Sequence, residues 1–221
     1  MPIKKIPDYY DTYWETGHHG GAMQGYFQNM LRWMDRELPT DLNFESILEA
    51  GCGAASFTKH LAKRCKYISA CDLSAGQIEA NRAAYPDTNF FVQDLSKPIG
   101  EKDKTFDALW CSEVLEHLFD PAYAVKEFHR VLKPDGRLLI TVPYHGRVKN
   151  VLIALFKWDE HFAADNPHIR FFTIKMLMRL VEKAGFHSIR TETCGMNKPL
   201  RDIFIPTNIL LSARKISSVV S

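Results

Sequence analysis

Two glycines between short apolar runs, followed by a carboxylate, are the feature that most limits what this chain can fold into. Residues 47 to 53 read Ile-Leu-Glu-Ala-Gly-Cys-Gly, a helical pattern opens near Ser56, and a second apolar run, Tyr67 to Cys71, ends on Asp72. Glycine permits a tight turn and a close approach of backbone to ligand, because a Cβ would push the ligand away or forbid the turn. Asp72, 21 residues after Gly51, is placed to accept hydrogen bonds from ribose hydroxyls. The sequence therefore predicts a βαβ unit that binds a ribose-containing ligand.

Two residues near these glycines narrow the choice of ligand. In the dinucleotide-binding pattern G-x-G-x-x-G a helix N-terminus faces a pyrophosphate, but here Ser56 stands at the third glycine position. Glu49 lies two residues before the first glycine, where a carboxylate would repel phosphate and suits a cationic amino-acid ligand. Glu49-x-Gly51-x-Gly53 resembles the first motif of class I S-adenosylmethionine-dependent methyltransferases. Ala55 stands where that family has a third small residue, often glycine.

Later segments extend the resemblance in the same order along the chain. Phe90 to Asp94 reads as a third strand that ends on an acid 22 residues after Asp72, and Phe106 to Cys111 reads as a fourth strand. Leu132 to Gly136 and Arg137 to Pro143 look like the family's turn and fifth strand. Short glycine patterns recur by chance, but several motifs in register along one chain are specific.

The resemblance implies a cofactor, a fold and a set of binding residues. The cofactor would be S-adenosyl-L-methionine, with S-adenosyl-L-homocysteine as product. The fold would be α/β and Rossmann-like: a doubly wound, mostly parallel seven-stranded sheet in the order 3-2-1-4-5-7-6, with an antiparallel seventh strand and helices on both faces. Asp94 would meet the adenine amino group, with Gln93 and Leu95 beside the ring. The residues expected to bind the cofactor are Glu49, Gly51, Cys52, Gly53, Asp72, Leu73, Gln93, Asp94, Leu95, Cys111 and Glu113.

Local signals predict where helices begin, because each start carries a side chain that can cap the first turn. These starts are Ser74 with Gln77, Asp120 with Pro121, and Thr173, whose helix would end at Gly185. Apolar runs over residues 187–193 and 208–213 predict the last two strands.

Composition favours one cytosolic unit. With 221 residues the chain can bury a full core, and a net charge of +2 is too small to indicate a nucleic-acid or membrane surface. Its five cysteines are scattered singly, which favours reduced thiols in a reducing compartment. No signal peptide is visible, and the longest apolar run, Val151 to Phe156, is far shorter than the ~20 residues that span a bilayer. We therefore expect a cytoplasmic protein with no membrane partner and no nucleic-acid partner; its oligomeric state is unreadable from the sequence.

Two segments fall outside the predicted core, and we expect substrate specificity to reside there. Residues 1–45 form an N-terminal helical lid or substrate segment, and residues 46–221 form the catalytic domain, with a cap insertion at 144–172 that lines the acceptor pocket. An apolar stripe in the first segment favours packing on the sheet: Met23, Phe27, Met30, Leu31 and Met34. An aromatic cluster before it is the candidate lid over the cofactor: Tyr9, Tyr10, Tyr13 and Trp14.

Methyl transfer to oxygen needs a base that removes a proton, and histidine suits this near neutral pH. Three of nine histidines stand near the expected mouth of the site, and we take them as candidate catalytic residues: His117, His145 and His168. Each could equally be an ordinary polar or packing residue. His18 and His19, near the candidate lid, are weaker candidates.

The run Glu113-x-x-Glu116-His117 resembles a metal-ligand run of small-RNA 2′-O-methyltransferases and of ubiquinone-pathway O-methyltransferases, in which a further histidine follows the fifth strand. His168 stands at about that place. Carboxylate and imidazole ligands suit a divalent cation that polarises a hydroxyl. The same spacing is also typical of a polar helix start, and many relatives with such runs use no metal. From the sequence we therefore assign no metal ligand.

Three classes of function stay open on these residues. The leading class is transfer of a methyl group to an oxygen or nitrogen atom of a small molecule, as in the ubiquinone-biosynthesis O-methyltransferase group that the chain resembles. RNA or another macromolecule is the alternative acceptor, which the low net charge disfavours. A non-catalytic nucleoside-binding module or an NAD-linked oxidoreductase on the same topology is a further alternative, since fold does not fix function.

Overall fold

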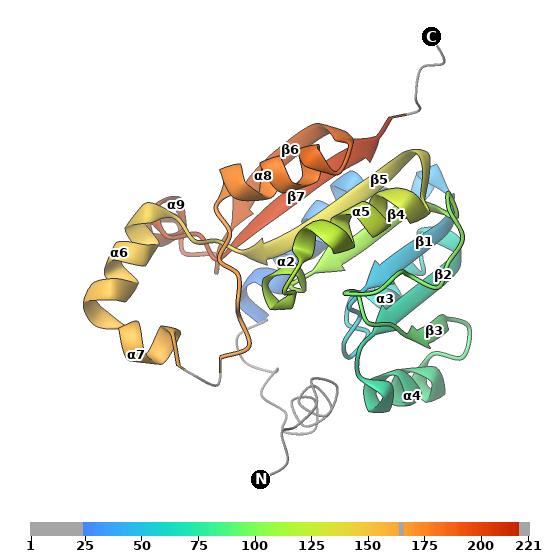
Figure 1. Ribbon diagram of the computed structural model, residues 1–221, viewed down its shortest axis with the longest axis horizontal. Coiled ribbons are helices and arrows are strands. Elements are labelled where there is room, and N and C mark those ends of the chain that lie inside the picture. Colours follow the sequence, from blue (N-terminus) through green and yellow to red (C-terminus); the bar gives the residue numbers. More distant parts are fainter. Residues whose placement is uncertain (1–23, 164–165, 217–221) are drawn as a thin grey trace.

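The computed structural model describes residues 24–163 and 166–216, which form one seven-stranded sheet with helices on both faces (Figure 1). The strands are β1 (Phe44–Ala50), β2 (Cys65–Asp72), β3 (Asn89–Val92), β4 (Phe106–Ser112), β5 (Leu132–Pro143), β6 (Phe186–Cys194) and β7 (Asn208–Lys215). Their order is β3-β2-β1-β4-β5-β7-β6. Only β7 runs antiparallel to its neighbours, β5 and β6. The predicted fold class and strand order are confirmed.

The helices connect these strands and cover three apolar clusters, the smallest of which lies under α4. They are α2 (Gln24–Glu37), α3 (Thr58–Leu61), α4 (Ala75–Ala84), α5 (Pro121–Val131), α6 (Arg147–Phe156), α7 (Trp158–His161), α8 (Ile174–Lys183) and α9 (Pro199–Phe204), with 3-10 turns η1 (Thr40–Leu42) and η2 (Leu115–His117). On one face α5 and α8 bury Phe128 and Leu177 against the sheet. On the other, α2 and α3 bury Met34 and Leu61 against Trp110 of β4.

Capping side chains begin three of these helices as predicted. Ser74 accepts a hydrogen bond from the Gln77 N–H, Asp120 from the Ala122 and Tyr123 N–H groups, and Thr173 from the Met176 N–H. The capping box at Ser74 is only half formed, because the Gln77 amide donates to Asn81 instead of turning back. The helix expected near Ser56 is short and begins at Thr58, since Ala55 takes a left-handed φ of +56° and the chain must turn first.

The stripe on α2 packs into the core. Met30 and Met34 are fully buried in the same cluster as Ile47 of β1, while Phe27 and Leu31 are partly buried at its margin. The helix therefore packs on the sheet and stabilises it, as the apolar stripe predicted. The aromatic residues 9–14 and the histidine pair at 18–19 lie outside the described residues, so a lid there stays a prediction.

The excursion over residues 144–172 is closed at its base and projects from the sheet. A parallel bridge joins Tyr144 to Phe172, and the His145 N–H donates to the Phe172 carbonyl (2.9 Å). Figure 1 shows α6 and α7 extending away from the sheet at the end where β5 finishes. Among the helices of the described residues, none is both long and apolar enough to cross a bilayer.

Candidate functional site

The glycine loop after β1 is held by hydrogen bonds to the end of β2. The Gly51 and Cys52 N–H groups both donate to the Cys71 carbonyl (2.8 and 2.9 Å). Gly51 has a φ of +78°, and a Cβ added there would lie 2.2 Å from Cγ2 of Val114. Glycine is therefore required first by the protein's own packing, and a side chain at residue 51 would collide with Val114 in the absence of any ligand.

Asp72 is fixed at the end of β2 by two backbone donors. The Gly53 N–H donates to Oδ2 (2.9 Å) and the Ser74 N–H donates to Oδ1 (3.0 Å). One carboxylate thus joins the glycine loop to the start of α4. The arrangement places Asp72 beside the loop, where the resemblance expects it to meet ribose hydroxyls.

Asn81, which the sequence analysis missed, braces the same loop from α4. Its side chain is buried and donates to the Gly53 carbonyl (2.7 Å). It also lies 3.7 Å from Cys52 Sγ, so Cys52 packs beneath the loop. Asn81 stands between Ala80 and Arg82 on α4, and this local sequence does not identify its partner 28 residues earlier.

Glu49 lies buried at the end of β1 and accepts a short hydrogen bond from the hydroxyl of Thr58, the first residue of α3. Burial raises the pKa of Glu49 to about 8; the Thr58 hydrogen bond opposes this shift and the nearby Asp72 adds to it. In the ligand-free protein the group is therefore mostly protonated at neutral pH. A cationic amino group nearby would favour its ionised form.

The predicted adenine side consists of the loop after β3. The Gln93 N–H donates to the Asp72 carbonyl (2.9 Å), which places this loop next to the ribose side. The Gln93 amide donates to Asp94 O (2.7 Å) and accepts from the Gly100 N–H (3.2 Å), so it folds the loop on itself. Oδ1 of Asp94 accepts from the Ser96 N–H (2.9 Å). Gln93 thus shapes this side of the site through its loop.

The remaining expected cofactor residues differ in what they can offer. Leu73 is partly buried after β2 and Leu95 is packed into the core. The thiol of Cys111 is fully buried within the core, where burial raises its pKa far above the usual range. The thiol of Cys111 therefore offers no accessible group to a ligand. Glu113, with a φ of +55°, accepts from the Thr141 hydroxyl (2.7 Å) and the Asn208 amide (2.6 Å).

Two of the three candidate catalytic histidines meet beside an acid. Ligand atoms of Glu116, His117 and His168 all lie within 4.8 Å of one another. Glu116 and His117 come from η2, directly after β4, while His168 comes from the excursion. The excursion is anchored there, because the N–H groups of Ile169 and Arg170 donate to the Glu116 carbonyl (2.9 and 3.0 Å).

The carboxylate of Glu116 is the unusual group in this cluster. The residue is 1% exposed, and neither carboxylate oxygen has a hydrogen-bond partner among the residues that the structure describes. Burial, followed by the nearby Glu113, raises its pKa well above the usual range. Nδ1 of His117 lies 3.2 Å from the Pro167 carbonyl, which can only accept a hydrogen bond, so Nδ1 carries the proton. Nε2 of the same ring therefore has a lone pair, and this nitrogen lies 3.9 Å from Oε1 of Glu116. This donor set fits a divalent cation, which would satisfy the buried oxygens.

Burial also keeps the histidines of this region neutral. It lowers the pKa of His168 to about 4, with the neighbouring His117 and His145 lowering it further, and lowers that of His145 likewise to about 4. His145 stands apart from the cluster: its Nδ1 lies 3.1 Å from Asn150 Oδ1, and its ring packs on His161 and Phe171. The structure therefore joins His117 to His168 and places His145 in an adjoining aromatic group.

Comparison with known proteins agrees with this geometry. A family model described as a methyltransferase domain matches residues 23–191. A ubiquinone biosynthesis O-methyltransferase of Xylella fastidiosa is 27% identical over 145 residues, which cover 63% of this chain and 57% of that protein. A demethylmenaquinone methyltransferase of Corynebacterium glutamicum is 31% identical over 136 residues, or 56% of this chain and 55% of that protein. This chain thus spans little more than half the length of these curated relatives.

Among solved structures, an S-adenosylmethionine-dependent methyltransferase from Mesorhizobium loti has a TM-score of 0.68 at 22% identity, covering 88% of this chain and 98% of that one. At this identity the likeness shows a shared fold. The family match is stronger, because it extends over most of the chain, from α2 into β6. The protein therefore belongs to the methyltransferase domain family.

Proposed function

We propose that the protein transfers a methyl group from S-adenosylmethionine to a hydroxyl oxygen of a small-molecule acceptor, with a divalent cation held by Glu116, His117 and His168. One observation carries this proposal: two buried, unpartnered oxygens of Glu116 stand beside two histidines. The names of the curated relatives, which concern ubiquinone and menaquinone, add support for a ring-bearing acceptor. None of these names favours RNA, a binding module or an NAD-linked reaction.

The chain's own residues would position and shield the reactants. Asp72, held by the Gly53 and Ser74 N–H groups, would orient the ribose, and Glu49 would face the amino-acid end of the cofactor. S-adenosylmethionine supplies an activated methyl group, so the protein must mainly align it with the acceptor and exclude water. The excursion over residues 144–172 would cap the acceptor pocket.

Removal of the acceptor proton is the step in which the histidines matter. A general base works best when its pKa lies near the working pH, whereas burial lowers the pKa of His145 and of His168 to about 4. Such imidazoles are weak proton acceptors but are neutral, as a metal ligand must be. A bound divalent cation would polarise the acceptor hydroxyl and make its proton easier to lose. We therefore assign His117 and His168 as ligands, and His145 to the wall of the pocket.

A transfer assay with methyl-labelled S-adenosylmethionine tests this function. A catechol-type diol, an aromatic amine and a short RNA would be compared, each with Mn²⁺ and with a chelator. We expect label in the diol only, and only with the cation. Equal labelling of the diol with and without chelator would refute the cation, while labelling of only the amine or the RNA would refute the hydroxyl acceptor.

A further inference from the structure

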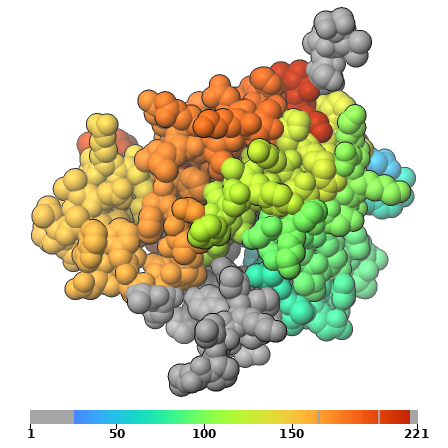
Figure 2. All heavy atoms as spheres, in the orientation of Figure 1, coloured from blue at the N-terminus to red at the C-terminus, as the bar shows by residue number. Residues whose placement is uncertain are grey.

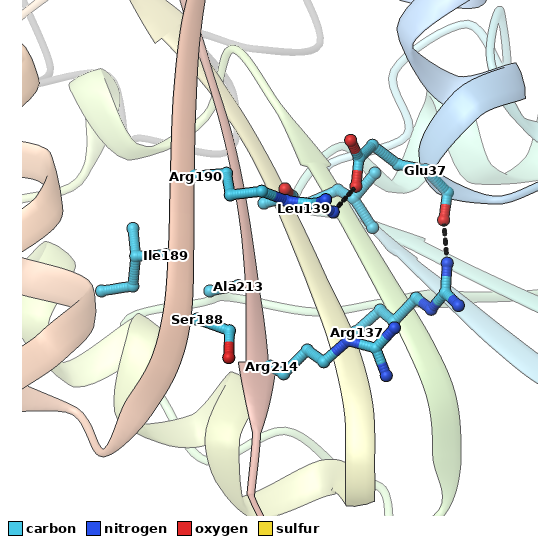
Figure 3. Close-up of a pocket in the computed structure, with 9 residues that line it drawn as sticks. Glu37, Arg137, Leu139, Ser188, Ile189, Arg190, Ala213 and Arg214 are labelled. Atoms are coloured by element: carbon cyan, nitrogen blue, oxygen red, sulfur yellow. Dashed lines mark hydrogen bonds and ion pairs between the residues drawn. The ribbon is translucent and has the colours of Figure 1, made fainter.

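A pocket lies away from the candidate site, toward the opposite end of the parallel strands. It has a volume of about 310 Å³ and is lined by Glu37, Arg137, Leu139, residues 188–190 and residues 212–214 (Figure 3). Arg137 of β5 pairs with Ala108 near the start of β4, and Arg214 stands near the end of the antiparallel β7, whereas the cofactor loop follows the end of β1 and contacts the end of β2. What binds here would therefore not occupy the methyl-transfer site.

Like charges face each other across this pocket. Arg137 and Arg214 are direct partners in the β5–β7 register, an arrangement that destabilises a strand pair. Arg190 lines the pocket from β6, and Figure 3 shows the side chains of Arg190 and Arg137 both directed toward Glu37. Burial lowers the pKa of Arg137, and Arg214 and Arg190 contribute to this shift. Repulsion between these arginines thus destabilises the sheet here, and a bound anion would reduce that repulsion.

Two nearby carboxylates, those of Glu37 and Asp107, already have cationic partners. Glu37, the acid that lines the pocket, pairs with Arg190 (2.6 Å) and with Arg36 (3.5 Å). Arg137 instead donates to the main-chain carbonyl of Glu37. In an adjacent hollow shared by Arg137 and Arg214, Asp107 pairs with Lys133 (2.8 Å). Within residues 24–163 and 166–216, neither Arg137 nor Arg214 forms an ion pair with a carboxylate.

Two hydroxyls complete the lining. β6 slips in register between His187 and Arg190, and Ser188 there has a φ of +51°, a left-handed conformation that few residues other than glycine adopt. Such bulges re-aim side chains, and this one places Ser188 on the pocket together with Ser212 of β7. Two guanidinium forks and two hydroxyls offer more donors than the two oxygens of a carboxylate can accept. They match the oxygens of a phosphate.

We propose that this pocket binds a phosphate group through Arg137, Arg214, Ser188 and Ser212. The volume leaves room for a small organic group beyond the phosphate, so the ligand is a phosphomonoester or the phosphate of a lipid headgroup. This site is independent of the proposed methyl-transfer function.

Calorimetric titration of the full chain with inorganic phosphate and with glycerol phosphate, at constant ionic strength, tests the site. The variant Arg214→Gln removes an exposed guanidinium that forms no described contact with the cofactor loop. Arg179→Gln, on the exposed side of α8, removes the same charge elsewhere and is the matched control. We expect saturable binding that Arg214→Gln weakens about tenfold or more and Arg179→Gln leaves unchanged. Binding of S-adenosylhomocysteine should be the same in all three proteins.

Vesicles distinguish the two sources of phosphate. Retention on phosphatidylglycerol vesicles, absent with phosphatidylcholine and lost in Arg214→Gln, would assign the site to a lipid headgroup. Binding of glycerol phosphate in solution without vesicle retention would assign it to a soluble ester. The proposal is overturned if neither the soluble phosphate compounds nor the phosphatidylglycerol vesicles bind. It is also overturned if Arg214→Gln and Arg179→Gln change the affinity for phosphate equally.

Discussion

The two halves of the candidate site are built on different principles. On the cofactor side, the polar groups are already paired within the protein: Asp72 with two N–H groups, and Glu49 with Thr58. On the acceptor side, Glu116 is buried, neither of its oxygens has a hydrogen-bond partner in the described part of the chain, and burial favours the neutral form of His168 beside it. Figure 2 shows the excursion, in gold and orange, as a mass beside the body that carries the cofactor loop.

The difference indicates which half depends on a ligand. A hydrogen-bonded loop is preorganised and loses little freedom when the cofactor binds. An unpaired buried carboxyl, in contrast, costs free energy until a proton or a cation satisfies it. We therefore expect substitutions on the cofactor side to act on folding and cofactor affinity, and substitutions on the acceptor side to act on cation binding.

The largest expected effect comes from Gly51→Ala. The new Cβ would lie 2.2 Å from Val114 Cγ2 at a φ of +78°, so overpacking and backbone strain act together. We expect the free energy of unfolding to fall by about 2–5 kcal/mol, measured by urea denaturation. Stability equal to that of the parent would contradict this account of the glycine.

Val114→Ala is the matched variant for that collision. Removing both Cγ atoms leaves Val114 Cβ at 3.4 Å from the new methyl, an ordinary contact. The double variant should lose about 1–3 kcal/mol less free energy of unfolding than the sum of the losses in the two single variants. The backbone strain of the positive φ at residue 51 should remain. Strict additivity would mean that strain alone makes glycine necessary.

The second prediction tests the acceptor half through Glu116→Gln. The amide keeps the shape but removes the charge that a cation would need, so Mn²⁺ affinity should fall about 100-fold in a calorimetric titration. Burial raises the pKa of Glu116 well above its usual range and so favours the neutral carboxyl, which is why the neutral amide should change the stability of the metal-free protein little. Glu113→Gln is the control, since that carboxylate is paired with Thr141 and Asn208. Equal Mn²⁺ affinity in the parent and the Glu116 variant would remove the cation site.

The two halves of the site also differ in how much of each could be predicted from the sequence. The glycine loop, Asp72 and the capped helix starts could be predicted because their partners are local or follow from strand order. Asn208 could not be linked to Glu113, because 95 residues separate them and the antiparallel register of β7 sets the contact. Whether Glu116 points inward or to solvent also depended on where the excursion returns, which no local pattern encodes. The sequence alone therefore could not bring together Glu116, His117 and His168, whose ligand atoms the fold places within 4.8 Å of one another.

The third prediction concerns Asp72→Ala. Loss of the carboxylate would remove the proposed acceptor for ribose hydroxyls and free the Gly53 N–H that it holds. Affinity for S-adenosylhomocysteine should fall by about 1–3 kcal/mol in calorimetry. Asn81→Ala, which releases the Gly53 carbonyl without touching the ribose position, should cost less. A larger loss with the Asn81 variant would mean that loop support outweighs ribose recognition.

The smallest expected effect is the release of a proton from Glu49 when the cofactor binds. Its pKa in the folded protein is raised to about 8, so this group favours the folded state below its ordinary pKa and loses that contribution as pH rises through 8. A cationic cofactor end would favour the carboxylate, so binding at pH 7 should release close to one proton from Glu49. Below pH 8, affinity should rise with pH by at most about tenfold per unit.

Calorimetry of S-adenosylhomocysteine in phosphate and in Tris measures this release, because the two buffers differ in ionisation enthalpy. The ligand's own amino group can also exchange a proton, and Glu49→Gln isolates that part because it keeps the shape of the side chain without its titration. If the parent and the Glu49 variant release the same number of protons at pH 7, Glu49 does not ionise on binding. The cofactor half would then be preorganised in its charge as well as in its hydrogen bonds, and the acceptor half alone would change protonation when its ligands arrive.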